Sequence, residues 1–255
     1  MTGRRRIISL HSYRGGTGKS TLAANFAWFA AARGDRVAVL DCDLVSPGIH
    51  ILFGLERDQI QLTLVDFLWG KCGLEETAYD VTERLRPPGD GKCWLIPASL
   101  TAQAITRVLE EGYDVQRLNS HFDQLLEYLD LDWLLIDTHP GLNRETLLTT
   151  AISDQLILIL RPDQQDYYGT AVINELAAKL EIRRIHLILN KVYSQADTAA
   201  LTTKVTEAFD HPVIGVLPLS EDLARLQSRE IIARAQPEHA VSRTIHDMAE
   251  TIFSS

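Results

Sequence analysis

The chain has 255 residues, 45% apolar and 23% charged, which is ordinary for a soluble globular protein. Its formal net charge of −9 argues against a protein built for non-specific binding to nucleic acid, although a local basic patch is compatible with it. No apolar run approaches the roughly 18 residues of a membrane span, and no signal peptide is visible. The widely spaced Cys42, Cys72 and Cys93 form no C-x-x-C pair, so we expect neither a zinc site nor a disulfide framework, and we expect a cytoplasmic protein.

Short apolar runs alternate with helical patterns along the whole chain. We predict buried strands at Ile7–Leu10, Val37–Leu40, Cys93–Ile96, Trp133–Ile136, Leu156–Leu160, His186–Leu189 and Val213–Leu217. We predict helices at Lys19–Arg33, Thr101–Glu110, Val115–Leu129, Glu145–Ile152, Tyr168–Leu180 and Asp197–Phe209. This alternation favours an α/β fold, a doubly wound and mainly parallel sheet flanked by helices, in one domain over residues 1–255. In such folds ligands bind beyond the carboxyl ends of the strands.

A glycine-rich loop follows the first predicted strand and leads into the first helix. It reads Arg14-Gly15-Gly16-Thr17-Gly18-Lys19-Ser20-Thr21. Glycines let backbone N–H groups turn inward to form a nest for an anion, and the helix N-terminus adds positive potential there. Lys19 adds a full positive charge, and the Ser20 hydroxyl is placed to ligate Mg²⁺. We therefore expect residues 15–21 to bind the phosphates of a nucleotide.

Carboxylates follow two other predicted strands. Asp41 and Asp43 come at the end of the second strand, and two residues at i and i+2 point to the same side of the chain. Asp137 ends the apolar run that begins at Trp133. Opposite a phosphate-binding loop, such acids hold Mg²⁺ and orient an attacking water, whereas on their own they would be solvated loop residues.

These motifs together resemble the ParA/MinD family of P-loop ATPases, whose deviant Walker A box reads K-G-G-x-G-K-[ST]. The resemblance covers nearly the whole chain and implies ATP, Mg²⁺, a face-to-face homodimer in the ATP state, and slow hydrolysis stimulated by an activator or adaptor protein. It assigns Asp43 to hydrolysis and Asp41 and Asp137, with Ser20, to the metal. It also makes Asn190 the adenine contact. The stretch Pro218–Leu219 becomes the other wall of the base pocket.

Two positions depart from the family pattern. Arg14 stands where the family has a lysine that reaches the partner's nucleotide, and we expect Arg14 to act in trans like an arginine finger. There are two alternatives: Arg14 binds phosphate in its own chain, or its side chain is too bulky for the dimer interface. His139 stands at a usual proline position, and we interpret it as a loop residue rather than a catalytic base.

Two apolar segments remain outside the nucleotide motifs. Near the C-terminus, apolar residues recur at helical spacing: Val241, Ile245, Met248 and Ile252. Since the other faces carry one arginine and two acids, we expect this helix to pack on the domain and predict no direct membrane anchor of the MinD kind. Residues 62–69 are predicted to form a core-facing helix, with an exposed partner-binding patch as the alternative.

The favoured function is a dimerising ATP switch that positions, partitions or assembles cargo through a partner protein. A metallocluster or cofactor maturation ATPase on the same fold would commonly carry a C-x-C or C-x-x-C pair, which this chain lacks. A weakly hydrolysing scaffold and a small-molecule kinase are further alternatives. The sequence leaves the cargo and the activator open. It also leaves open whether DNA is bound by the basic residues Arg4–Arg6, Arg183, Arg184, Lys191 and Lys204.

Overall fold

The fold is built on one eight-stranded sheet with the strand order β3-β4-β2-β5-β1-β6-β7-β8. The structure is a computed structural model that describes residues 6–99, 101–182 and 184–254, without the side chains of Arg6 and Glu145. Every neighbouring pair of strands is parallel except β3 with β4. The predicted α/β class with a mainly parallel sheet is therefore confirmed. The basic residues Arg4, Arg5 and Arg183 lie outside the described residues, as does the side chain of Arg6.

The strands are β1 Arg6–His11, β2 Arg36–Asp41, β3 Tyr79–Asp80, β4 Lys92–Ile96, β5 Trp133–Asp137, β6 Gln155–Leu160, β7 Arg184–Val192 and β8 Val213–Pro218. The longer helices are α1 Lys19–Ala32, α5 Ala102–Glu111, α6 Val115–Ser120, α7 Phe122–Tyr128, α8 Arg144–Ala151, α9 Gln164–Lys179, α10 Thr198–Phe209 and α13 Ala240–Phe253. Shorter helical turns are α2 Ile49–Leu52, α3 Leu64–Leu68, α4 Thr82–Leu85, α11 Glu221–Arg225 and α12 Ile232–Ala235, with 3₁₀ turns at Arg57–Gln59 and Glu75–Thr77.

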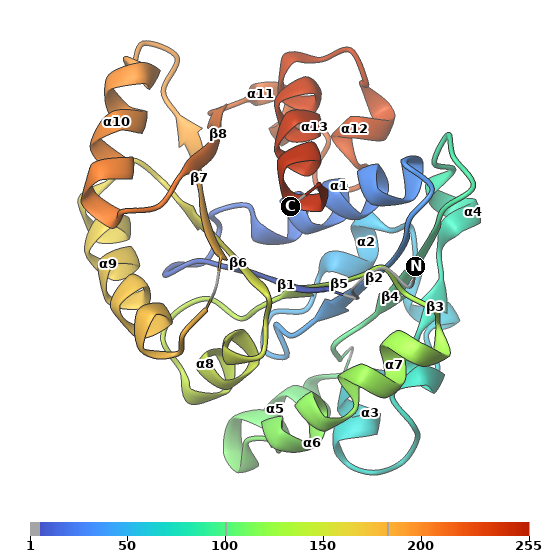
Figure 1. The fold of residues 1–255 in the computed structure, drawn as a ribbon. Coiled ribbons are helices and arrows are strands. Elements are labelled where there is room, and N and C mark those ends of the chain that lie inside the picture. The colour runs from blue at the N-terminus through green and yellow to red at the C-terminus, as the bar shows by residue number, and fades with distance from the viewer. Residues whose placement is uncertain (1–5, 100, 183, 255) are drawn as a thin grey trace.

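Helices cover both faces of the sheet (Figure 1). Successive side chains of a strand point to opposite faces, so a strand covered on both sides must be apolar throughout. In β5, Leu135 packs in the cluster that contains α1 and α13, whereas Leu134 and Ile136 pack in the cluster that contains α3, α6 and α7. A third cluster joins β6 and β7 to α9 and α10.

All seven predicted strands are present, but some helices differ from the prediction. The helix predicted over Val115–Leu129 is broken at His121, between α6 and α7. Helix α9 begins at Gln164, before the predicted Tyr168, because the Asp163 side chain caps it by accepting from the Asp166 N–H. The two-residue strand β3 was not predicted, since so short a segment carries no periodicity.

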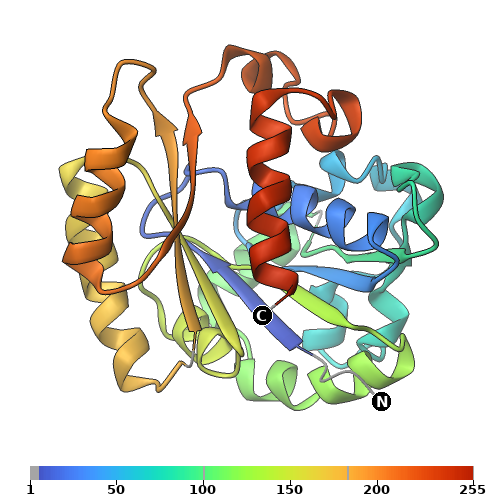
Figure 2. The ribbon, with the colours of Figure 1, turned by 45° about the horizontal axis from the view of Figure 1, so that its top comes forward.

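The C-terminal helix packs on the domain as predicted. Its apolar stripe is buried against α1 and β8, with Val241, Ile245, Met248 and Ile252 at most 1% exposed. Figure 2 shows α13, in red, on the same face of the sheet as α1, in blue. Residues 62–69 likewise contribute a core helix, because Leu64, Val65 and Phe67 of α3 are buried. None of the helices in the described part of the chain combines the length and the hydropathy of a membrane-spanning helix.

Candidate nucleotide-binding site

The loop between β1 and α1 has the backbone that a phosphate nest requires. Gly16 and Gly18 have φ of +72° and +102°, in the region that favours glycine. A Cβ on Gly18 would lie 2.5 Å from Nδ2 of Asn190, so any larger residue would collide with β7. The next residue, Lys19, is the first residue of α1, whose N-terminus therefore points into the loop.

A cavity of about 740 Å³ opens over this loop. It lies beyond the carboxyl ends of the strands, where the sequence predicts a ligand. Ten of the predicted site residues line this cavity: Gly15, Gly16, Gly18, Lys19, Ser20, Thr21, Asp43, Asn190, Pro218 and Leu219. Thr17, Asp41 and Asp137 are buried next to it and do not line it. Arg14, which directly precedes Gly15, does not line it either.

Asp41 and Asp137 form the acidic floor beside the loop. They are paired in register on the neighbouring strands β2 and β5, and each is 1% exposed. Burial, then the neighbouring carboxylates, raises the pKa of Asp41 well above its usual value, and burial raises the pKa of Asp137 to about 6. The nearby Ser20 side chain and Lys19 act on the Asp137 pKa in the opposite direction.

The acidic floor fits a Mg²⁺ ion. Oδ2 of Asp41 and Oδ1 of Asp137 are buried and have no hydrogen-bond partner among the described residues. Buried carboxylate oxygens without donors are costly unless a cation satisfies them, and Mg²⁺ prefers oxygen ligands. The residues present, Asp41, Asp137 and the adjacent Ser20, therefore match the donor set that the sequence predicts for the metal.

Lys19 is a buried ammonium next to this floor, 7% exposed. Burial lowers its pKa, although the nearby Asp137, Asp43 and Asp41 act in the opposite direction. Its Nζ donates to the hydroxyl of Ser12, 3.1 Å away, at the end of β1. An ammonium in this position, at the rim of the cavity, is suited to a phosphate group.

Asn190 and Lys191, at the end of β7, hold the glycine-rich loop from the other side. Nδ2 of Asn190 donates to the Thr17 carbonyl at 2.7 Å, and its Oδ1 accepts from the Lys191 N–H. Lys191 has φ of +59°, and its Nζ donates to the Gly16 carbonyl at 2.6 Å. Asn190 therefore fixes the loop as well as lining the cavity. The role of Lys191 was missed because a lysine after a strand carries no signal of its own.

Asp43 and His139 meet above the acidic floor. Nδ1 of His139 is 2.7 Å from Oδ1 of Asp43. Burial raises the pKa of Asp43, but the hydrogen bond and charge of His139, with the Ser46 N–H and Lys19, outweigh it, so this pKa lies below its usual value. The sequence interpretation of His139 as a loop residue is correct for its position but missed this contact.

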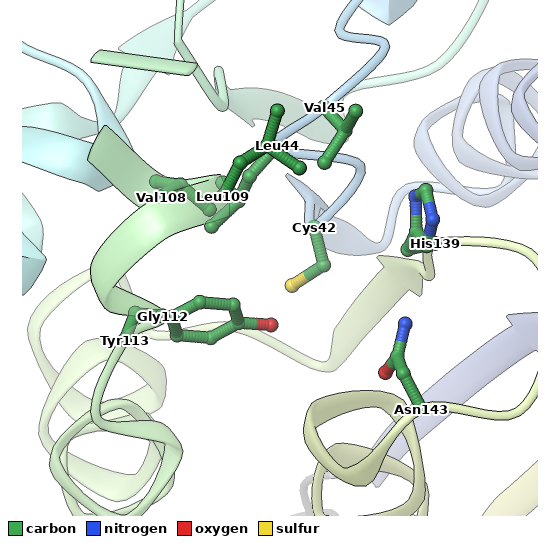
Figure 3. A pocket seen from close by; sticks show the side chains of 9 residues that line it. All are labelled: Cys42, Leu44, Val45, Val108, Leu109, Gly112, Tyr113, His139 and Asn143. Carbon is green, nitrogen blue, oxygen red and sulfur yellow. The ribbon is translucent and has the colours of Figure 1, made fainter. Parts of the chain in front are cut away.

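His139 also lines a second cavity, of about 290 Å³, between residues 42–45, α5 and residues 139–143. Figure 3 shows the thiol of Cys42 and the hydroxyl of Tyr113 pointing toward each other in it, with His139 and Asn143 on the other side. The aliphatic walls are Leu44, Val45, Val108 and Leu109. The His139–Asp43 contact thus lies between the two cavities, because Asp43 lines the larger one.

Arg14 is held within its own chain by the start of α9. Its Nε donates to Oδ1 of Asp166 and its Nη2 to Oδ2 of Asp163, both at 2.6 Å, and its Nη1 donates to Gln165. Asp166 also accepts from the Arg161 side chain and N–H. A trans role of Arg14 therefore requires these contacts to exchange for contacts with a partner.

The predicted basic patch is spread out in the described part of the chain. Arg184 and Lys191 stand near opposite ends of β7, which at about 3.3 Å per residue places them about 23 Å apart. Lys204, on α10, lies over the ring of Tyr167. These three side chains therefore do not converge on one point.

The family model of the CobQ/CobB/MinD/ParA nucleotide-binding domain matches residues 8–232. The uncharacterised ATP-binding protein MJ0547 of Methanocaldococcus jannaschii is 29% identical over 211 residues, which cover 83% of this chain and 73% of that protein. The septum site-determining protein MinD of Pyrococcus horikoshii, solved with Mg-ADP, has a TM-score of 0.79 at 22% identity, with 98% of this chain and 96% of that chain covered.

The MinC:MinD cell division protein complex of Aquifex aeolicus gives a TM-score of 0.82 at 20% identity, over 98% of this chain and 96% of that chain. These two likenesses concern the fold, whereas the family model spans the strands that carry the glycine-rich loop, the acidic floor and Asn190. The chain belongs to the CobQ/CobB/MinD/ParA family of P-loop nucleotide-binding ATPases.

Proposed function

We propose that the protein is a Mg²⁺-dependent ATPase of low intrinsic rate that dimerises when it binds ATP and thereby controls a partner protein in the cytoplasm. The dimer would position, partition or assemble a cargo through that partner. The observation that carries the proposal is the pair of unpartnered buried oxygens of Asp41 and Asp137 beside Ser20 and Lys19. A relative named for ATP binding and a MinD structure with Mg-ADP support the choice of cofactors.

Each residue of the site has a distinct task in this proposal. Mg²⁺, when bound, would neutralise charge that develops on the phosphates. Lys19 would hold the outer phosphates, and Asp43 would orient the attacking water. Asn190, with the stretch Pro218–Leu219 opposite, would enclose the adenine. Because phosphoryl transfer depends on positioning and charge, the site requires no separate base.

Exposed apolar side chains near Tyr13, which contacts α9 and residue 141, support dimerisation on this part of the surface. Tyr13 on the glycine-rich loop, Leu142 after β5 and Tyr168 on α9 are 37%, 38% and 74% exposed. Large apolar groups of this kind suit a surface that another chain covers. The MinC:MinD complex contains a protein of this fold together with a partner protein. This supports the proposal that the present chain also acts through a partner protein. In the dimer, Arg14 would leave Asp163 and Asp166 and bind the partner's nucleotide.

The test is solution mass with ADP and with ATP for the wild type and for Asp43→Ala, Arg14→Ala and Arg161→Ala. We expect ATP to convert wild type and Asp43→Ala to dimers, with the Asp43→Ala dimer persisting because hydrolysis is blocked. Arg14→Ala should stay monomeric. Arg161→Ala is the matched control, since it removes another guanidinium from Asp166 and should still dimerise.

A mass that never depends on nucleotide would exclude the dimer switch and favour a scaffold or a kinase on the same fold. Equal behaviour of Arg14→Ala and Arg161→Ala would exclude the trans role and leave Arg14 as part of an internal ion pair. Turnover of ATP, measured on the same samples as released phosphate, tests the ATPase activity independently of the mass.

A further inference from the structure

His139 makes a directed contact with the carboxylate that the proposed hydrolysis depends on. Its Nδ1 lies 2.7 Å from Oδ1 of Asp43, and the two side chains are 32% and 18% exposed. An ionised carboxylate only accepts hydrogen bonds, so Nδ1 of His139 carries the hydrogen and donates it. The short distance is typical of a charge-assisted bond.

The register of the sheet explains why these two residues meet. Asp41 of β2 is paired with Asp137 of β5. Asp43 and His139 stand two residues beyond these partners, on loops that leave the same edge of the sheet. The side chain of His139 therefore reaches from one loop to the other. Pro140 follows His139 and has a fixed φ, which restricts the backbone of this loop.

The contact leaves Asp43 able to act. The Ser46 N–H donates to the same oxygen, Oδ1, at 3.0 Å. A carboxylate has about four lone-pair sites on its two oxygens, so two donors on one oxygen fix the group without filling it. Asp43 also lines the nucleotide cavity, whereas His139 lines the smaller cavity behind it. His139 thus holds Asp43 from the side away from the nucleotide.

We propose that His139 is a positioning residue that fixes the Asp43 carboxylate in the orientation needed to direct the attacking water. The inference rests on the proposed ATPase activity and deepens it. Phosphoryl transfer depends on how accurately the water is placed. An Asp43 carboxylate held by the Ser46 N–H alone would be less firmly oriented, and the chemical step would be slower. Nucleotide binding would not change, because His139 does not line the nucleotide cavity.

The experiment compares phosphate release and ATP affinity for wild type, His139→Ala, His139→Asn and Asp43→Ala in the full chain. We expect His139→Ala to lower kcat about tenfold, the effect of one charge-assisted hydrogen bond, and to leave the ATP affinity within about twofold of wild type. His139→Asn should recover most of kcat, because its amide nitrogen donates from nearly the same place as Nδ1.

His121→Ala is the matched control. His121 is also partly buried, and its Nδ1 makes a 2.7 Å contact, to the Arg117 carbonyl, away from both cavities. This variant should keep the wild-type kcat. If His121→Ala lowers kcat as much as His139→Ala does, the effect is a general loss of structure and the proposal is wrong.

The remaining outcomes distinguish a failure of the inference about His139 from a failure of the proposed ATPase activity. Wild type that releases no phosphate means that the proposed activity fails, and the inference fails with it. Wild type that is active, with an inactive Asp43→Ala and an unchanged His139→Ala, overturns only the inference. A faster His139→Ala also overturns it, since His139 would then restrain Asp43 from acting. A kcat that His139→Asn does not recover contradicts the hydrogen bond as the cause.

Discussion

Asp166 is a carboxylate that two arginines hold at the start of α9. It is 1% exposed and accepts from Arg14 and Arg161. Burial raises its pKa, but the hydrogen bonds from Arg161 and Arg14 outweigh burial, so the pKa lies below its usual value. A carboxyl with a lowered pKa in the folded state stabilises the fold above its ordinary pKa. That contribution is lost as the pH falls through the lowered value.

We therefore predict that Asp166→Asn lowers the free energy of unfolding by about 2 kcal/mol at pH 7, because Arg14 and Arg161 lose their charge-assisted hydrogen bonds to Asp166 and keep only Asp163 as an ion-pair partner. The difference from wild type should shrink below about pH 4, as the wild-type carboxyl becomes protonated. Urea unfolding at pH 7 and pH 3 measures both effects.

The control is Glu221→Gln, in which a 90% exposed carboxylate loses its ion pair with Arg225. An exposed pair of this kind contributes about 0–1 kcal/mol. If Asp166→Asn and Glu221→Gln lower the free energy of unfolding equally, the contacts of Asp166 with Arg14 and Arg161 do not stabilise the monomer as proposed.

Helix α13 and strand β8 approach each other closely at a single glycine. A Cβ on Gly215 would lie 2.1 Å from Sδ of Met248, which is fully buried. We predict that Gly215→Ala and Met248→Ala each lower the free energy of unfolding, by about 1–3 kcal/mol from overpacking and about 2–5 kcal/mol from a cavity.

In the double variant the new methyl group occupies space that the Met248 side chain has left. The loss of unfolding free energy in the double variant should therefore be smaller than the sum of the two single losses, by at least about 0.5–1 kcal/mol. Urea unfolding measures all three values. Additive losses would show that β8 and α13 do not pack as the structure has them.

At the scale of elements, strands and helices could be predicted from the sequence where their own residues show an apolar pattern. Strand β5 is an apolar run that ends in Asp137, and buried parallel strands read in this way. The start of α9 was missed because residues 164–167 are mostly polar, and the only local signal is the Asp163 cap. The break at His121 was missed because apolar residues continue at helical spacing on both sides of it.

The convergence of the candidate site residues was predictable for the same reason. The glycine-rich loop and the acids are adjacent in sequence to strand ends, so their convergence follows from a parallel sheet. The His139–Asp43 contact and the anchoring of Gly16 by Lys191 depend on the order of the strands in the sheet. Strand order cannot be obtained from periodicity in one sequence, and β2, β5, β1 and β7 are far apart along the chain.

At the scale of the whole molecule, the candidate nucleotide site joins segments from both halves of the chain. The cavity is lined from Gly15 to Ile245, and the acidic floor comes from β2 and β5. A ligand that contacts these segments binds the folded state alone and therefore stabilises all of it. At 100 times its Kd, such a ligand adds about 2.7 kcal/mol, which for a chain of this size raises Tm by roughly 5–10 °C.

We predict that ATP with Mg²⁺ raises Tm more than ATP with EDTA does, because Mg²⁺ would satisfy the unpartnered oxygens of Asp41 and Asp137. Differential scanning fluorimetry of wild type and Asp137→Ala in both conditions measures the effect. In Asp137→Ala the response to ATP with EDTA should remain, and the extra increment from Mg²⁺ should disappear. If wild type responds equally with and without Mg²⁺, the acidic floor is not a metal site, since its two oxygens would then stay unsatisfied in the nucleotide complex.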